Sequence, residues 1–244
     1  MLADHQSGGL TQIGSLDSDV HLPASSRYEL IDFIADQLPL WRDRIERKGV
    51  VAETVLTSQL CAHLNSAARL SGGWDFLQFR VEESDEENPG RKIDLVPAPS
   101  GVAVWIDSRR YVDFDTLMPI ECKRLPTPSG ATRDAREYVF NENASTGGIQ
   151  RFKEGLHGAK HALGGMIAYI QEETAEDWHP RVSTWIDGLA RAGEPGWSTT
   201  DLVHAEGLPK RSGLSRYKSN HTRISGLSSI ELRHLWIEMP LPSA

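Results

Sequence analysis

Apolar residues in the first half of the chain recur first with the period of helices and then with that of strands. Between Tyr28 and Gly49 they return every three or four residues, which predicts an amphipathic helix, and the same spacing predicts a second helix over residues 51–70. Short runs of β-branched and aromatic residues follow. They predict strands over residues 76–81, 92–96, 102–106 and 117–125. Consecutive strands of this kind indicate an antiparallel meander.

The second half alternates between the two periods. We expect helices over residues 149–163 and 178–192, and strands over residues 166–170 and 230–239. Residues 1–26 are rich in Ser, Gly and Asp and have little apolar periodicity, so we expect a mobile leader there. The whole pattern predicts a single α/β domain over residues 27–240.

Composition narrows the class of protein. The 244 residues carry 26 Lys and Arg against 34 Asp and Glu, a formal net charge of −8 that on its own argues against binding to phosphate backbones. No apolar run reaches the roughly 18 residues of a membrane span, so we expect a cytoplasmic protein without a membrane partner. Two cysteines, Cys61 and Cys122, are too few for a disulfide framework or a four-ligand zinc site.

The position of the charges changes this picture. The negative charge is concentrated in residues 82–87 and 172–177, whereas residues 207–223 contain no acid. This predicted basic loop contains Lys210, Arg211, Arg216, Lys218 and Arg223. A cluster of cations in an acidic protein is suited to a phosphate backbone, although a basic loop is also a common feature of ordinary protein surfaces.

The candidate chemistry lies in two predicted strands. In a strand, alternate side chains share a face, so Glu121 and Lys123 point to one side while Ile120 and Cys122 point into the apolar layer. Asp94 lies in the strand over residues 92–96, where burial of a carboxylate is costly unless a cation compensates it. Two carboxylates from adjacent strands would offer Mg²⁺ the oxygen ligands it prefers. Lys123 could then orient, or help deprotonate, a water aimed at a phosphorus atom.

Asp94 followed by Glu121-x-Lys123 resembles the PD-(D/E)xK signature of restriction-endonuclease-like nucleases. The order of predicted elements over about residues 51–171 is similar to the common core of that family: helix, three-stranded antiparallel meander, helix, strand. Residues 172–240 would form a C-terminal extension. The resemblance implies that Asp94 and Glu121 bind Mg²⁺, for which Mn²⁺ can substitute, and that Lys123 positions the attacking water.

The resemblance also suggests two further site residues. Glu53, near the start of the first core helix, matches a position where many members have a third metal ligand, and Gln150 fits loosely a catalytic glutamine in the helix after the motif. Two positions depart from the pattern. Residue 93 is Ile rather than the name-giving proline, and residue 154 is Glu where exonuclease-like members have tyrosine, which favours an endonuclease.

Each candidate has a purely structural alternative. The three motif residues could form a buried ion pair that closes a strand end, and Glu53 could simply favour the helix dipole. Gln150 and Arg151 begin a predicted helix, where they could hold a phosphate or be solvated residues of the first turn. His157 and His161 share a helix face, but no third ligand stands at a diagnostic spacing, so we expect no metal there.

The sequence therefore predicts a Mg²⁺-dependent DNA endonuclease, with restriction or anti-phage defence as the role that analogy suggests. Two alternatives remain open. One is a catalytically silent nucleic-acid-binding or complex-forming module with the same fold, and the other is a nuclease that acts on RNA. Cleavage of both strands of a duplex usually needs two active sites, so we also expect a homodimer or a partner protein subunit.

Overall fold

The computed structural model describes residues 19–47, 49–130, 133–207, 213–224 and 226–239. Its centre is a seven-stranded mixed sheet with the strand order β2-β3-β6-β7-β10-β9-β8. The strands are β2 (Leu77–Ser84), β3 (Lys92–Pro99), β6 (Ile120–Leu125), β7 (Leu163–Ile170), β8 (His204–Ala205), β9 (Leu214–His221) and β10 (Ile230–Glu238). Strand β3 runs antiparallel to both of its neighbours, β2 and β6, whereas β6, β7 and β10 are parallel. The predicted α/β class is confirmed.

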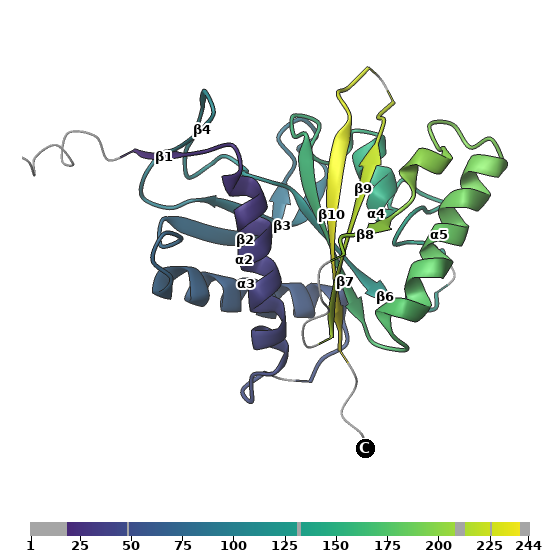
Figure 1. The fold of residues 1–244 in the computed structure, drawn as a ribbon, viewed down its shortest axis with the longest axis horizontal. Helices are drawn as coiled ribbons and strands as arrows, with labels where there is room; N and C mark the ends of the chain where they lie inside the picture. The colour runs from purple at the N-terminus through teal and green to yellow at the C-terminus, as the bar shows by residue number, and fades with distance from the viewer. Residues whose placement is uncertain (1–18, 48, 131–132, 208–212, 225, 240–244) are drawn as a thin grey trace, which may run out of the picture.

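Helices cover both faces of this sheet (Figure 1). Helices α2 (Ser26–Arg42) and α3 (Glu53–Leu70) pack on one face, and α4 (Gly148–Lys153) and α5 (Ala175–Arg191) pack on the other. Strand β7 shows how the sequence supports both layers. Ile167 and Tyr169 join the core beneath α2 and α3, while the alternate residues Met166 and Ala168 join the core beneath α4 and α5. Every residue of β7 is therefore buried.

A second, three-stranded sheet lies beside the main one. It consists of β1 (Val20–Leu22), β4 (Val104–Ile106) and β5 (Arg109–Tyr111), with β1 parallel to β4. Most of the predicted leader, residues 1–18, lies outside the described residues. For residues 20–26 the leader prediction is wrong, because Val20 and Leu22 pair with β4 and pack against the core. The strand predicted over 102–106 exists, but it belongs to this small sheet rather than to the meander.

Two other boundaries differ from the prediction. The helix expected over 149–163 ends at Lys153, because Gly155 and Gly158 take positive φ angles of 70° and 62° that a helix cannot accommodate. The loop expected over 207–223 is wrong for residues 214–221, which form β9 and alternate between buried and exposed positions over Tyr217 to His221. No helix in the described part of the chain is long and apolar enough to cross a membrane.

Candidate active site

Strands β3 and β6 bring together the three residues of the predicted motif. The strands are antiparallel neighbours, with Leu95 opposite Ile120, so Asp94 and Glu121 lie at the same point of the sheet. Lys123 follows two residues after Glu121 on the same strand, and its side chain therefore leaves on the same face. The period of the strand and the antiparallel pairing thus place an acid, a second acid and a lysine side by side.

Lys123 lies at the centre of three carboxylates. Its Nζ is 2.7 Å from Glu121 Oε1, 3.5 Å from Glu53 Oε1 and 3.7 Å from Asp94 Oδ2. We call Glu53, Asp94, Glu121 and Lys123 the carboxylate cluster. Burial alone would lower the pKa of Lys123, but the three carboxylates more than offset this effect, so its pKa stands above the usual value. A protonated Lys123 is suited to donate hydrogen bonds, so the raised pKa favours the orienting role over the role of a base.

The two strand carboxylates are in opposite electrostatic states. Burial would raise the pKa of Glu121, but Lys123, His157 and Arg151 outweigh burial and hold it below its usual value. For Asp94, burial and then the nearby charge of Glu121 raise the pKa to about 7, against a usual 3.8. Asp94 Oδ2 accepts a 2.8 Å hydrogen bond from the backbone N–H of Cys122. An ionised Asp94 is thus a group that gains from an additional positive charge.

Two residues that follow β6 in the sequence, Arg151 and His157, also contact the carboxylate of Glu121. Arg151 Nη1 donates to Glu121 Oε1 at 2.5 Å, and His157 Nδ1 lies 3.0 Å from Glu121 Oε2. Both Glu121 and His157 are fully buried. The other ring nitrogen of His157, Nε2, is buried and has no polar partner among the described residues. Both oxygens of Glu121 are thus faced by side chains that can donate to them, which fixes the position of this carboxylate.

Nothing in the sequence pattern marked His157 as a neighbour of Glu121. The glycine-rich turn after α4 folds this residue back onto β6, and a helix continuing over 149–163 would have placed it elsewhere. His161, which the sequence paired with it, lies apart from the cluster, with its Nε2 3.7 Å from Glu86.

The donor set of the cluster fits Mg²⁺ better than zinc. In the part of the chain that the structure describes, no three Asp, Glu, His or Cys side chains form a ready-made metal cage. Mg²⁺ needs no such cage, since it is usually bound through one or two carboxylates and keeps several waters. A pocket of about 370 Å³ opens beside the cluster and is lined by Glu53 and Asp94 together with residues of α3 and β2, which leaves room for those waters. The side chains of Asp94 and Glu53 are 26 % and 24 % exposed, so their carboxylate oxygens are the ones open to this pocket.

Glu53 reaches the cluster from the first residue of α3. Its Oε1 faces Lys123, and its Oε2 accepts a 3.0 Å hydrogen bond from the backbone N–H of Arg124. The structure thus brings Glu53 together with the two strand carboxylates. Its expected role as a third metal ligand stays a prediction.

Gln150 does not join the cluster. It is buried, and its Oε1 accepts hydrogen bonds from the backbone N–H groups of Asn141 and Gly147, at 3.0 and 3.2 Å. Its Nε2 donates to Glu154 at 2.9 Å. These bonds close the loop before α4, so we assign Gln150 a structural role and no longer a catalytic one.

The cations predicted to contact nucleic acid are dispersed in the structure. Arg151 belongs to the cluster around Glu121, and Lys210 and Arg211 lie outside the described residues. Arg216 pairs with Asp32 and Glu206, and Lys218 is exposed on β9.

Arg223 is only 4 % exposed, and its guanidinium donates to the carbonyl groups of Gly158, His161 and Ser228. Because these bonds tie two loops together, the expected contact between Arg223 and nucleic acid is not retained. Lys218 stays a candidate contact.

Comparisons of the chain with protein-family models, with curated proteins and with solved structures find no match.

Proposed function

We propose that this protein is a Mg²⁺-dependent nuclease that hydrolyses phosphodiester bonds in DNA. The observation that carries the proposal is the convergence of Asp94, Glu121 and Lys123 from adjacent strands, next to a pocket that Asp94 and Glu53 line. The order of elements from α3 through the β2-β3-β6 meander and α4 to β7 supports the resemblance to PD-(D/E)xK nucleases.

Asp94 and Glu121 would hold the cation, with Glu53 beside them. When bound, Mg²⁺ neutralises the negative charge that develops on the phosphoryl oxygens and the leaving group. Lys123 is protonated, so it donates hydrogen bonds that orient the attacking water toward phosphorus. The water oxygen forms a bond to phosphorus and gives up one proton to bulk solvent, while the ester P–O bond breaks and the leaving oxygen takes up a proton from solvent. Arg151 and His157 keep Glu121 in place during this step.

The identity of the substrate rests on analogy with the family, and the alternatives stay open. Contacts to a phosphate backbone do not report the sugar, so RNA is the second candidate substrate. A catalytically silent module that binds nucleic acid or a partner protein is the candidate from another class. The intact set of Asp94, Glu121 and Lys123 favours the enzyme, because a silent module has no need of it. A homodimer or a partner subunit, a cytoplasmic location and a defence role remain predictions.

Incubation with a panel of substrates tests the proposal. Supercoiled, linear and single-stranded DNA and RNA would each be treated with Mg²⁺, Mn²⁺ or EDTA. We expect cleavage with either metal, none with EDTA, and a rate lower by about 10²–10³-fold in Lys123→Ala. Lys160→Ala is the matched control, since Lys160 is half exposed and pairs with Glu87 away from the cluster. Full activity in Lys123→Ala would overturn the proposed mechanism, and cleavage of no substrate would favour the silent module.

A further inference from the structure

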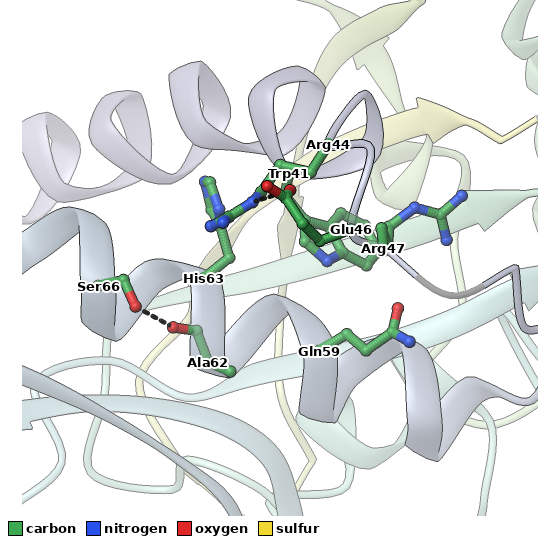
Figure 2. Close-up of a pocket in the computed structure, with 8 residues that line it drawn as sticks. All are labelled: Trp41, Arg44, Glu46, Arg47, Gln59, Ala62, His63 and Ser66. Atoms are coloured by element: carbon green, nitrogen blue, oxygen red, sulfur yellow. Dashed lines mark hydrogen bonds and ion pairs between the residues drawn. The ribbon is translucent and has the colours of Figure 1, made fainter.

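A second pocket, of about 390 Å³, lies between the end of α2 and the side of α3 (Figure 2). One wall is formed by Trp41, Arg44, Glu46 and Arg47, and the other by Gln59, Ala62, His63 and Ser66. The four residues from α3 are spaced by three, one and three positions, so they share one face of that helix. Glu53 precedes Gln59 by six positions, which turns it by roughly 120° to a different face. This pocket is therefore separate from the carboxylate cluster.

Arg47 is a partly buried cation that forms no ion pair with a described carboxylate, and the nearby charge of Asp43 compensates it only in part. Its guanidinium lies 5.5 Å from the ring centre of Trp41, and its Nε donates to the carbonyl of Arg42 at 3.0 Å. Its Nη1 is buried and has no hydrogen-bond partner among the described residues. The nearest acids in the sequence are already engaged, because Asp43 pairs with Arg42 and Glu46 pairs with Arg44. A partly buried guanidinium in this situation gains from an added anion.

Trp41 contributes a second unused donor to the same pocket. The indole is only 2 % exposed, and no described residue accepts a hydrogen bond from its Nε1. An indole N–H can only donate, so any group that satisfies it must carry an acceptor. His63 lines the same wall, but its Nε2 donates to Gln37 Oε1 at 3.1 Å, so the neutral ring has an acceptor at Nδ1 and we assign it no contact with an anion.

We propose that this pocket binds a phosphate oxyanion, supplied by a free nucleotide or by the backbone of a nucleic acid. Arg47 and Trp41 would donate hydrogen bonds to its oxygens, and Arg44 at the exposed rim would add positive charge. Arginine is well suited to this task, because its planar guanidinium matches the geometry of phosphate oxygens. The volume is in the range of small-ligand pockets. The inference does not depend on Mg²⁺ or on cleavage, since no residue of the carboxylate cluster takes part.

Isothermal titration calorimetry on the full chain tests this site. Inorganic phosphate, a mononucleotide and a short single-stranded oligodeoxynucleotide would each be titrated in low salt with EDTA, so that no cleavage occurs. We expect binding to wild type that is weakened at least about tenfold in Arg47→Gln. Arg69→Ala is the matched control, because Arg69 is exposed on α3 and does not line the pocket. Thermal unfolding of each variant verifies folding, and Arg44→Gln provides a second pocket variant.

The outcomes separate the two sources of the phosphate. Binding of phosphate or mononucleotide supports a free ligand, whereas binding of the oligonucleotide alone, still sensitive to Arg47→Gln, supports a nucleic-acid backbone. Binding of none of the three, or an equal loss in Arg47→Gln and Arg69→Ala, overturns the inference. Repeating the titration with Lys123→Ala distinguishes it from the proposed nuclease activity, because that variant keeps the phosphate site even where cleavage is lost.

Discussion

Two buried polar clusters in this protein invite opposite conclusions about function. One is the carboxylate cluster. The other, which we call the serine–histidine chain, runs through Asp201, His221, Ser219, His234 and Tyr138. By composition it looks like the site of a hydrolase, since Asp201 Oδ1 lies 2.7 Å from His221 Nδ1 and His221 Nε2 lies 2.7 Å from Ser219 Oγ. All five residues are at most 1 % exposed, so a substrate has no access to the serine.

The hydrogen bonds of the serine–histidine chain are complete. Ser219 Oγ is also 2.7 Å from His234 Nε2, and His234 Nδ1 is 2.7 Å from the Tyr138 hydroxyl, which accepts from Trp236 Nε1. One consistent set of donors therefore runs from Trp236 to Asp201. The carboxylate cluster differs in two respects: it opens beside a pocket, and it gathers three carboxylates around the single ammonium of Lys123. Access and the balance of charge, rather than residue types, distinguish the two clusters.

The largest expected effect is that of Asp94→Asn. Removing this carboxylate would reduce cleavage by roughly 10³-fold, because the cation loses one of its ligands. In EDTA at pH 8 the same change would raise the free energy of unfolding by about 1 kcal/mol or more, because it removes a buried charge next to Glu121. Nuclease assays and urea unfolding measure the two quantities. Asp187→Asn, in a surface pair with Arg191, is the control; a large loss of stability in Asp94→Asn would mean that the cluster is structural.

Asp201→Asn should lower the stability of the protein and leave its activity unchanged, which is the reverse of what we expect for Asp94→Asn. Asp201 Oδ1 is 2.5 Å from the ammonium of Lys153, and both side chains are almost fully buried. The variant leaves this cation without its carboxylate, so we expect a loss of about 3–5 kcal/mol in the free energy of unfolding. Activity per folded molecule should be unchanged. An activity loss that exceeds the loss of folded protein would bring the serine–histidine chain into the mechanism.

Ser219→Ala tests the structural role of the serine–histidine chain with a smaller expected loss of stability than Asp201→Asn. The variant leaves His221 and His234 each without one hydrogen bond, which should cost about 1–3 kcal/mol of stability. Assays with an activated ester would detect a serine nucleophile. We expect no esterase activity in the wild-type protein and normal nuclease activity in the variant, whereas serine-dependent ester hydrolysis would contradict the structural role.

The two clusters should also respond to pH with opposite signs. Burial lowers the pKa of His221 and His234, so below the usual value of 6.5 the unfolded state binds more protons and stability falls as pH drops. Asp94, with its pKa raised to about 7, binds a proton more readily in the folded state, and stability rises as pH falls from 7 toward 3.8. Urea unfolding in EDTA at pH 7.5, 6.5 and 5.5 separates the two contributions.

In Asp94→Asn only the histidine contribution remains, so stability should fall between pH 6.5 and 5.5. The advantage of this variant over wild type should shrink over the same range. An advantage that is independent of pH would contradict the raised pKa of Asp94.

The sequence was most informative where a local period determines the geometry. The two-residue period of β6 places Glu121 and Lys123 on one face, and the apolar residues around Asp94 mark a strand in which a carboxylate needs compensation. Ile120 and Cys122 are buried in the apolar core, as the alternation predicts. Glu53 follows from the family resemblance, which expects a glutamate near the start of the first core helix, and α3 does begin at this residue.

The sequence was less informative where tertiary contacts override local pattern. The sequence predicted a basic loop over the residues of β9, because Arg216 and Lys218 dominate the segment. In the structure these residues alternate with the buried Tyr217 and Ser219, which is the two-residue period of a strand. The role of Arg223 depends on carbonyl groups some 60 residues away in the sequence. His157 reaches Glu121 only because of a turn built on glycines with positive φ. The periodicity of apolar residues in one sequence does not predict contacts between residues so far apart in the chain.

The most direct test of the central claim is the effect of Mg²⁺ on stability without any substrate. The free energy of unfolding would be measured for wild type, Asp94→Asn and Asp201→Asn, with Mg²⁺ or with EDTA. We expect Mg²⁺ at one hundred times its dissociation constant to stabilise wild type and Asp201→Asn by about 2.7 kcal/mol, and to leave Asp94→Asn unchanged. Equal stabilisation of all three proteins, or no stabilisation of wild type, would contradict a Mg²⁺ site at the carboxylate cluster.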